Sequence, residues 1–151
     1  MSGSGFFLML NIRKHKIRLI VAIILWAILL VVLALEPDTA VKTCLPKHIL
    51  RDLAHSVAYG MLAVLCYLYF HFKRNVLSHR MTEGSIFLCS FLIASGWGIF
   101  TEILQYYSPT RRAEFSDVLY DMAGAFVGIV FFILTKKKLK TFFLPLISKV
   151  S

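Results

Sequence analysis

Four long apolar runs constrain the fold of this chain more than any other feature of its sequence. They cover residues 19–35, 53–72, 85–107 and 117–134. Each run is close to the roughly 20 residues that an α-helix needs to cross about 30 Å of hydrocarbon. A segment inside a bilayer must satisfy its backbone polar groups internally, which a helix does. We therefore predict an all-α fold, a four-span transmembrane helical bundle.

The composition agrees with a membrane protein. Of the 151 residues, 58% are hydrophobic and 17% are charged, whereas soluble domains average about 45–50% and about 25%. The formal net charge is +9, and the basic residues lie between and beyond the apolar runs. This arrangement suits an anionic membrane surface. No basic stretch is interleaved with aromatic residues, so we expect no nucleic-acid partner.

The three cysteines support neither a disulfide framework nor a zinc site. Cys44, Cys66 and Cys89 are an odd number and have no C-x-x-C spacing. Neither a soluble domain nor an internal repeat is visible, and we predict that residues 1–151 form a single domain. The absence of an inverted repeat also disfavours a secondary transporter.

The two ends of the sequence carry signals of their own. Basic residues precede the first apolar run, as in a secretory signal peptide. That run is long for a signal peptide and no cleavage motif follows, so we predict an uncleaved span. In residues 136–151, apolar residues recur on one helical face and lysines surround them. This pattern predicts an amphipathic segment at the membrane interface, weakened as a helix by Pro145.

The distribution of positive charge predicts the topology. The N-terminal segment, the connection at 73–84 and the tail hold 12 of the 17 Lys and Arg residues. With four spans, these three segments share one side of the membrane. Positive residues favour the cytoplasmic side. We therefore predict that both termini are cytoplasmic, and that the connections at 36–52 and 108–117 face outward.

Polar residues then converge on the outer face from three separate spans. They lie at the start of the second span, the end of the third and the start of the fourth. Carboxylates inside a span are energetically expensive and usually face a partner or a water-filled cavity. Chance placement would scatter such residues, so we predict a polar pocket. Its members are His55, Tyr59, Glu102, Gln105, Arg112, Asp117 and Asp121.

Helical spacing indicates which way these side chains point. Asp117, Asp121, Gly124 and Gly128 recur at three- and four-residue intervals and therefore share one stripe. The Gly-x-x-x-Gly pair permits close approach of a second helix. We expect this stripe, with its carboxylates, to face the bundle interior. Small residues thin the third span near Glu102 in the same way; they are Ser95, Gly96 and Gly98.

Each residue also has a structural interpretation. His55 alone is typical of an ordinary interfacial histidine, and Tyr59 of an aromatic belt. Glu102 can pair with Arg111 or Arg112 to fix the helix ends. Asp117 is placed where a helix N-cap is expected, but Asp121 lies one turn deeper. Together these residues favour a functional pocket over a purely structural network.

The same residues resemble the VanZ-like family. Its pattern is a His-x-x-x-Tyr helix, a Glu-x-x-Gln helix end, an Arg, a Ser-x-x-Asp pair, and Asp or Asn followed by x-x-Gly-x-x-x-Gly. The resemblance covers about residues 50–130 in the right order and spacing. Ala58 stands where the family often has an acidic residue, and Asp121 where it often has Asn. The matching positions are Arg51, His55, Tyr59, Glu102, Gln105, Arg112, Ser116, Asp117, Asp121, Gly124 and Gly128.

The resemblance implies a small multi-pass protein of the bacterial cytoplasmic membrane. The family's founding member is associated with low-level teicoplanin resistance, but the resemblance supplies no reaction. It therefore indicates a cell-envelope compartment and an amphiphilic or lipid partner.

Two classes of function fit the pocket. In one, the protein binds or modifies an amphiphilic cell-envelope molecule. In the other, it is a membrane-embedded, metal-assisted hydrolase or transferase for a lipid-linked substrate. The candidate catalytic residues are His55, Glu102, Asp117 and Asp121, with His55 or Glu102 as general base. The candidate substrate-binding residues are Arg51, Tyr59, Gln105, Arg111 and Arg112. The oxygen-rich set Asp117, Asp121 and Glu102 would suit Mg²⁺ or Ca²⁺.

Overall fold

The computed structural model contains four helices, α1 (Gly3–Leu35), α2 (Lys47–Leu77), α3 (Glu83–Tyr106) and α4 (Phe115–Ile147). It describes residues 3–35, 47–77, 81–108 and 115–147, and side chains within 14–35, 52–74, 81–108 and 115–136. Each helix contains a segment long and apolar enough to cross a membrane. The four-span, all-α prediction is therefore confirmed for the described residues.

The helices extend past the apolar runs from which they were predicted. The membrane-spanning segments are Lys14–Leu35, Asp52–Arg74, Glu83–Tyr106 and Phe115–Lys136. An apolar run reflects the thickness of the hydrocarbon, whereas backbone hydrogen bonds continue into the polar flanks. The predicted loop before the fourth span is accordingly shorter, because α4 already begins at Phe115. The predicted tail segment continues α4 without a break, through Pro145 to Ile147.

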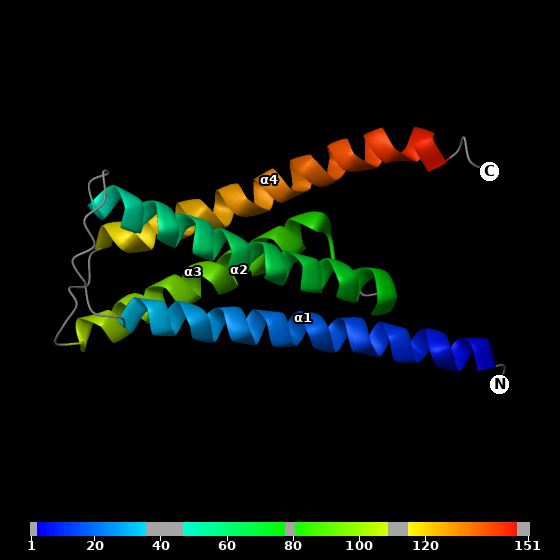
Figure 1. The fold of residues 1–151 in the computed structure, drawn as a ribbon, viewed down its shortest axis with the longest axis horizontal. Coiled ribbons are helices and arrows are strands. Elements are labelled where there is room, and N and C mark those ends of the chain that lie inside the picture. The colour runs from blue at the N-terminus through cyan, green and yellow to red at the C-terminus, as the bar shows by residue number, and fades with distance from the viewer. Residues whose placement is uncertain (1–2, 36–46, 78–80, 109–114, 148–151) are drawn as a thin grey trace.

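The helices run alternately up and down the bundle (Figure 1). The start of α1 and the end of α4 lie at one end of the bundle, where α2 also ends and α3 begins. The opposite end gathers the end of α1, the start of α2, the end of α3 and the start of α4. We call this opposite end the site end. α2 contacts all three other helices, whereas α1 contacts α2 and α3 but not α4 among the described residues.

Glycine allows α2 and α4 to cross backbone against backbone. A Cβ atom built on Gly124 would lie 2.0 Å from the carbonyl oxygen of Ser56, and one on Gly128 would lie 2.8 Å from Cα of Gly60. The Ser56 hydroxyl donates a hydrogen bond of 3.0 Å to the carbonyl of Tyr120 across the same contact. The close approach predicted for Gly124 and Gly128 is confirmed, with the Ser56–Gly60 face of α2 as its partner.

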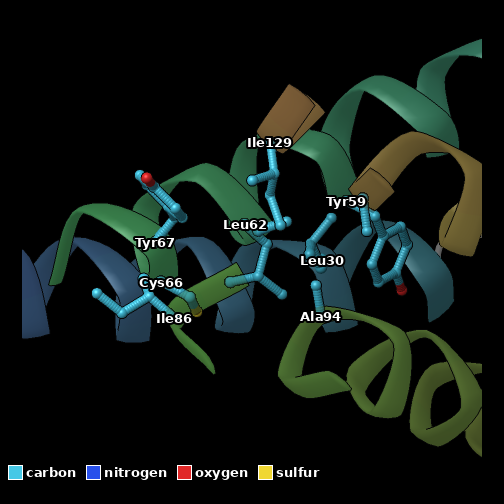
Figure 2. Packing of buried hydrophobic residues seen from close by; sticks show 10 residues of the cluster. Leu30, Tyr59, Leu62, Cys66, Tyr67, Ile86, Ala94 and Ile129 are labelled. Atoms are coloured by element: carbon cyan, nitrogen blue, oxygen red, sulfur yellow. The ribbon is translucent and has the colours of Figure 1, made fainter. Parts of the chain in front are cut away.

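A small apolar core fills the centre of the bundle. Figure 2 shows its side chains, which come from all four helices. Ala63, Ile86, Ala94, Ala125 and Ile129 are completely buried. Many of the apolar side chains outside this core are exposed, as expected where they would meet lipid chains rather than water.

α1 lies at the edge of the bundle and is held by hydrogen bonds to backbone carbonyls. The indole of Trp26 donates to the carbonyl of Ala58 at 2.9 Å, and that of Trp97 donates to Ala27 at 3.2 Å. The Gln105 amide donates to the carbonyl of Ala34 at 3.2 Å. All three contacts lie within membrane-spanning segments, so these bonds compensate for the limited side-chain packing of α1.

A second polar cluster, which the sequence did not single out, ties the helices together at the end opposite the site end. Glu83 accepts hydrogen bonds from Tyr67 at 2.8 Å and from Arg74 at 2.6 Å. His71 lies 2.8 Å from the Lys136 ammonium of α4 and 3.8 Å from Glu83. The cluster joins α2 to the start of α3 and to the end of the α4 span.

Candidate functional site

The polar residues predicted to converge do so at the site end of the bundle. His55 and Tyr59 come from the third and fourth turns of α2, Glu102 and Gln105 from the last turns of α3, and Asp117 and Asp121 from the first turns of α4. Because α2 and α4 begin where α3 ends, the helical alternation brings these segments to one depth. We refer to these six residues and Thr101 as the polar cluster.

Burial distinguishes this cluster from ordinary interfacial residues. Tyr59, Thr101, Gln105 and Asp121 are each 1% exposed, Asp117 is 3% and Glu102 is 7% exposed. The His55 side chain is 17% exposed and is the most accessible of the seven. The interpretation of Tyr59 as an aromatic-belt residue is wrong, since such a residue faces the membrane interface. A ligand would reach the cluster past His55.

The closest charged contact in the cluster joins α2 to α4. Nδ1 of His55 lies 3.4 Å from Oδ1 of Asp121. Neither oxygen of Asp121 accepts a hydrogen bond from the described part of the chain. Asp117 and Glu102 also act electrostatically on His55. His55 therefore pairs with Asp121 at the end of the bundle where Asp117 and Glu102 are also buried.

Gly98 makes the space that Asp121 occupies. A Cβ atom on Gly98 would lie 2.9 Å from Oδ2 and 3.1 Å from Cβ of Asp121. The predicted thinning of α3 is confirmed at Ser95 and Gly98, which are buried. It is wrong for Gly96, which is exposed and has nothing within 4 Å of its Cβ position.

A hydrogen-bond chain orients Tyr59. Its hydroxyl bonds to Thr101 of α3, and Thr101 in turn donates to the carbonyl of Gly98 at 2.9 Å. Because Thr101 has a single hydroxyl proton, Tyr59 is the donor in their bond. The Tyr59 ring also stacks near His55, with ring centroids 6.2 Å apart. Thr101 was not predicted, since a threonine in an apolar run gives no sequence signal of its own.

The structure adds detail on Asp117 and Gln105. Asp117 lies inside the first turn of α4, two residues after its start, so it is not the N-cap. Its carboxylate is still well placed for the positive end of the helix dipole. The amide nitrogen of Gln105 donates to the carbonyl of Ala34, and its role in substrate binding stays a prediction. That donor therefore holds α1 against α3.

The structure describes the predicted arginines only in part. The Arg51 backbone lies in α2, one turn before His55, but its side chain is outside the described residues. Arg111 and Arg112 lie outside the described residues altogether.

Among the described residues, no three His, Cys, Asp or Glu side chains are grouped so that they could hold a metal ion. The predicted metal-binding set of Asp117, Asp121 and Glu102 gains no support from this geometry.

A sequence model of the VanZ/LLP1 family matches residues 4–136. The chain belongs to this family. The comparisons with curated proteins and with solved structures gave no match. The matched region of this VanZ/LLP1 protein contains the four membrane-spanning segments and every residue of the polar cluster.

The cluster of this VanZ/LLP1 protein combines a proton acceptor with hydrogen-bonding groups in a nearly dry site. A carboxylate beside a histidine orients the ring and stabilises its protonated form. Such a pair can exchange a proton with a bound molecule, or can hold a polar group that donates hydrogen bonds. In a dry environment each of these interactions is stronger than in water.

Proposed function

We propose that this VanZ/LLP1 protein binds an amphiphilic cell-envelope molecule, with the polar cluster holding the molecule's polar end. The observation that carries the proposal is the burial of Glu102, Asp117 and Asp121 inside a membrane-spanning bundle, with His55 paired to Asp121. Ionisable residues at such positions are expensive and usually mark a functional site. The partly exposed His55 provides the point of contact for the ligand.

The direction of the site follows from the charge distribution. Twelve of the 17 Lys and Arg residues belong to residues 1–18, 73–84 and 136–151. The described parts of these segments lie at the end of the bundle where α1 begins and α4 ends. The positive-inside rule puts those segments in the cytoplasm. The cluster then faces the outer leaflet of the bacterial cytoplasmic membrane, where lipid-linked envelope molecules are accessible. The resemblance of these residues to the VanZ-like pattern supports a link to teicoplanin resistance.

Catalysis at the same site is the second candidate function. It is favoured by the pairing of His55 with Asp121, since an imidazole beside a carboxylate can act as a general base. The enzyme would be a hydrolase or transferase for a lipid-linked substrate. Binding and catalysis differ in one outcome, because only catalysis changes the composition of the envelope lipids.

The proposal can be tested by drug susceptibility. The wild-type protein and a His55→Asn variant are expressed in a teicoplanin-susceptible Gram-positive host, and the inhibitory concentration of teicoplanin is measured. We expect a several-fold rise with the wild-type protein and none with His55→Asn at equal membrane abundance. His15→Asn is the matched control, because His15 is exposed on α1 and distant from the cluster in sequence. Equal protection by both variants would contradict the proposal.

The same cells distinguish the two candidates. Mass spectrometry of envelope lipid extracts compares cells that contain the wild-type protein, the His55→Asn variant or neither. A new or depleted species that depends on His55 would establish catalysis. Unchanged extracts together with protection would establish binding.

A further inference from the structure

An apolar groove runs along the outer side of the contact between α2 and α4. Its volume is about 700 Å³. Its floor is the glycine contact of Gly60, Gly124 and Gly128, where the two backbones touch. Its walls include Val57 of α2, which is 65% exposed, and Val127 of α4, which is 62% exposed. None of the polar cluster residues lines the groove.

The groove is long and narrow and starts at the site end of the bundle. On α2 it extends from Leu53 to Val64, 11 residues apart. At a rise of 1.5 Å per residue this is about 16 Å, close to half of the roughly 30 Å hydrocarbon thickness. The groove begins near the start of the Asp52–Arg74 span, and on α4 it runs from Ala123 to Thr135, next to the last residue of the Phe115–Lys136 span. It is therefore open to the leaflet at the site end and continues past the middle of the bilayer.

The head of the groove adjoins the polar cluster. Leu53 and Ser56 line the groove and flank His55 in the sequence. Ser56 bonds to the carbonyl of Tyr120, the residue before Asp121. An occupant of the groove therefore has its membrane-surface end within about one helical turn of the His55–Asp121 pair.

We propose that the groove binds the hydrocarbon chain of an amphiphile from the leaflet at the site end. The inference rests on the proposed function, since it places the tail of the molecule whose polar end the cluster holds. The walls are apolar, the floor bears no side chains, and the groove starts beside the polar cluster. These features fit an extended acyl chain, which needs no hydrogen-bonding partner along its length. The alternative occupant, a helix of a second copy, is separated by the experiment below.

The experiment uses the full chain in vesicles of phosphatidylethanolamine and phosphatidylglycerol. A trace of phosphatidylglycerol carries a diazirine in its acyl chain, and labelled peptides are identified after illumination. We expect labelling of the α2 and α4 groove walls several-fold above that of α1, whose apolar residues are equally exposed. Equal labelling of all lipid-facing helices would overturn the proposal, because lipid would then cover the groove as it covers any other face.

Filling the groove provides the matched variant. Val127→Trp places a large side chain on the wall without touching the glycine floor, and it should abolish the excess labelling of α2. Val32→Trp is the control, because Val32 is 51% exposed on α1 and does not line the groove. Retained labelling in Val127→Trp would overturn the proposal.

Two further measurements keep the outcomes distinct. His55→Asn should lose drug protection but keep the groove labelling. Failure of the proposed function can therefore be distinguished from failure of the acyl-chain proposal. A Val127→Cys variant without the native cysteines reports on a second copy. Efficient disulfide-linked dimers in the vesicles would assign the groove to a helix of another molecule and overturn the acyl-chain proposal.

Discussion

Nδ1 of His55 and Oδ1 of Asp121 lie 3.4 Å apart and join the second helix to the fourth at the most accessible point of the polar cluster. Asp121 is 1% exposed, so its carboxyl group has little contact with water. The two side chains are thus coupled in energy as well as in position. The first prediction therefore concerns the coupling free energy between His55 and Asp121.

A double-mutant cycle measures this coupling. His55→Asn and Asp121→Asn are made singly and together, and the free energy of unfolding is obtained by titration with sodium dodecyl sulfate in mixed micelles. Residues that share a polar network show coupling energies of about 0.5–3 kcal/mol. We expect a favourable coupling in this range. Strict additivity of the two changes would show that the pair contributes nothing to stability.

The second prediction concerns Gly98. In Gly98→Ala, the new methyl group meets Oδ2 and Cβ of Asp121, so the carboxyl group must move. Overpacking of this kind lowers the free energy of unfolding by about 1–3 kcal/mol. Because Asp121 is displaced, we also expect drug protection to be lost. Gly96→Ala is the control, since its Cβ meets nothing within 4 Å. The control should be neutral or more stable by about 0.5–1 kcal/mol, because alanine favours a helix more than glycine does.

Comparison of these two glycines shows how far the sequence determines the site. Helical spacing predicted that Asp121 faces inward, and its 1% exposure confirms this. Gly96 and Gly98 looked equivalent in the sequence, yet only Gly98 faces α4. A difference of two residues is about 200° around a helix, so the identity of the neighbouring helix decides which glycine is used. That identity depends on packing between distant segments.

Thr101 and Gln105 show the same limit for hydrogen bonds. Glu-x-x-Gln spacing indicated two polar side chains on one face of the third span. It could not show that Gln105 donates to Ala34, a backbone carbonyl of α1. Backbone acceptors are present at every residue, so a sequence does not reveal which one a side chain will reach. The hydrogen bond from Tyr59 to the Thr101 hydroxyl is hidden because a threonine in an apolar run gives no sequence signal of its own.

The third prediction tests the contact between α2 and α4. In Gly124→Ala, a Cβ atom would lie 2.0 Å from the Ser56 carbonyl oxygen and 2.5 Å from its Cα. Backbone atoms cannot move aside as a side-chain end does, so the helices must separate. We expect the free energy of unfolding to fall by about 1–3 kcal/mol or more. Gly84→Ala is the control, since its nearest neighbour is the Thr82 hydroxyl oxygen at 3.9 Å. Equal stability of the two variants would contradict this contact.

The fourth prediction tests the orientation in the membrane. Tyr107 is 79% exposed at the site end, and Gly84 is exposed at the other end. Tyr107→Cys and Gly84→Cys are made without the native cysteines and treated in intact cells with a membrane-impermeant maleimide. We expect labelling of Tyr107→Cys alone, because the positive residues keep the other end in the cytoplasm. The reverse pattern would place the polar cluster at the cytoplasmic face and remove the envelope proposal.

The fifth prediction concerns Glu102, which is 7% exposed and acts electrostatically on both His55 and Tyr59. Glu102→Gln keeps the shape of the side chain and removes its ionisable proton and its charge. If the site binds through charge or transfers a proton, this variant should lose drug protection while remaining folded. Full protection by Glu102→Gln would reduce the role of Glu102 to structure alone.

The same carboxyl groups decide whether a divalent cation takes part. Asp117 and Asp121 are one helical turn apart, and like charges at that distance disfavour each other. A cation between them would relieve the repulsion and would raise the unfolding temperature by mass action. The described residues do not form a group that could hold a metal, so we expect the midpoint to be the same in millimolar Mg²⁺, in Ca²⁺ and in chelator. The comparison is made on the purified protein and on Asp121→Asn. A metal-dependent rise that disappears in Asp121→Asn would contradict this expectation and would favour the metal-assisted hydrolase or transferase over simple binding.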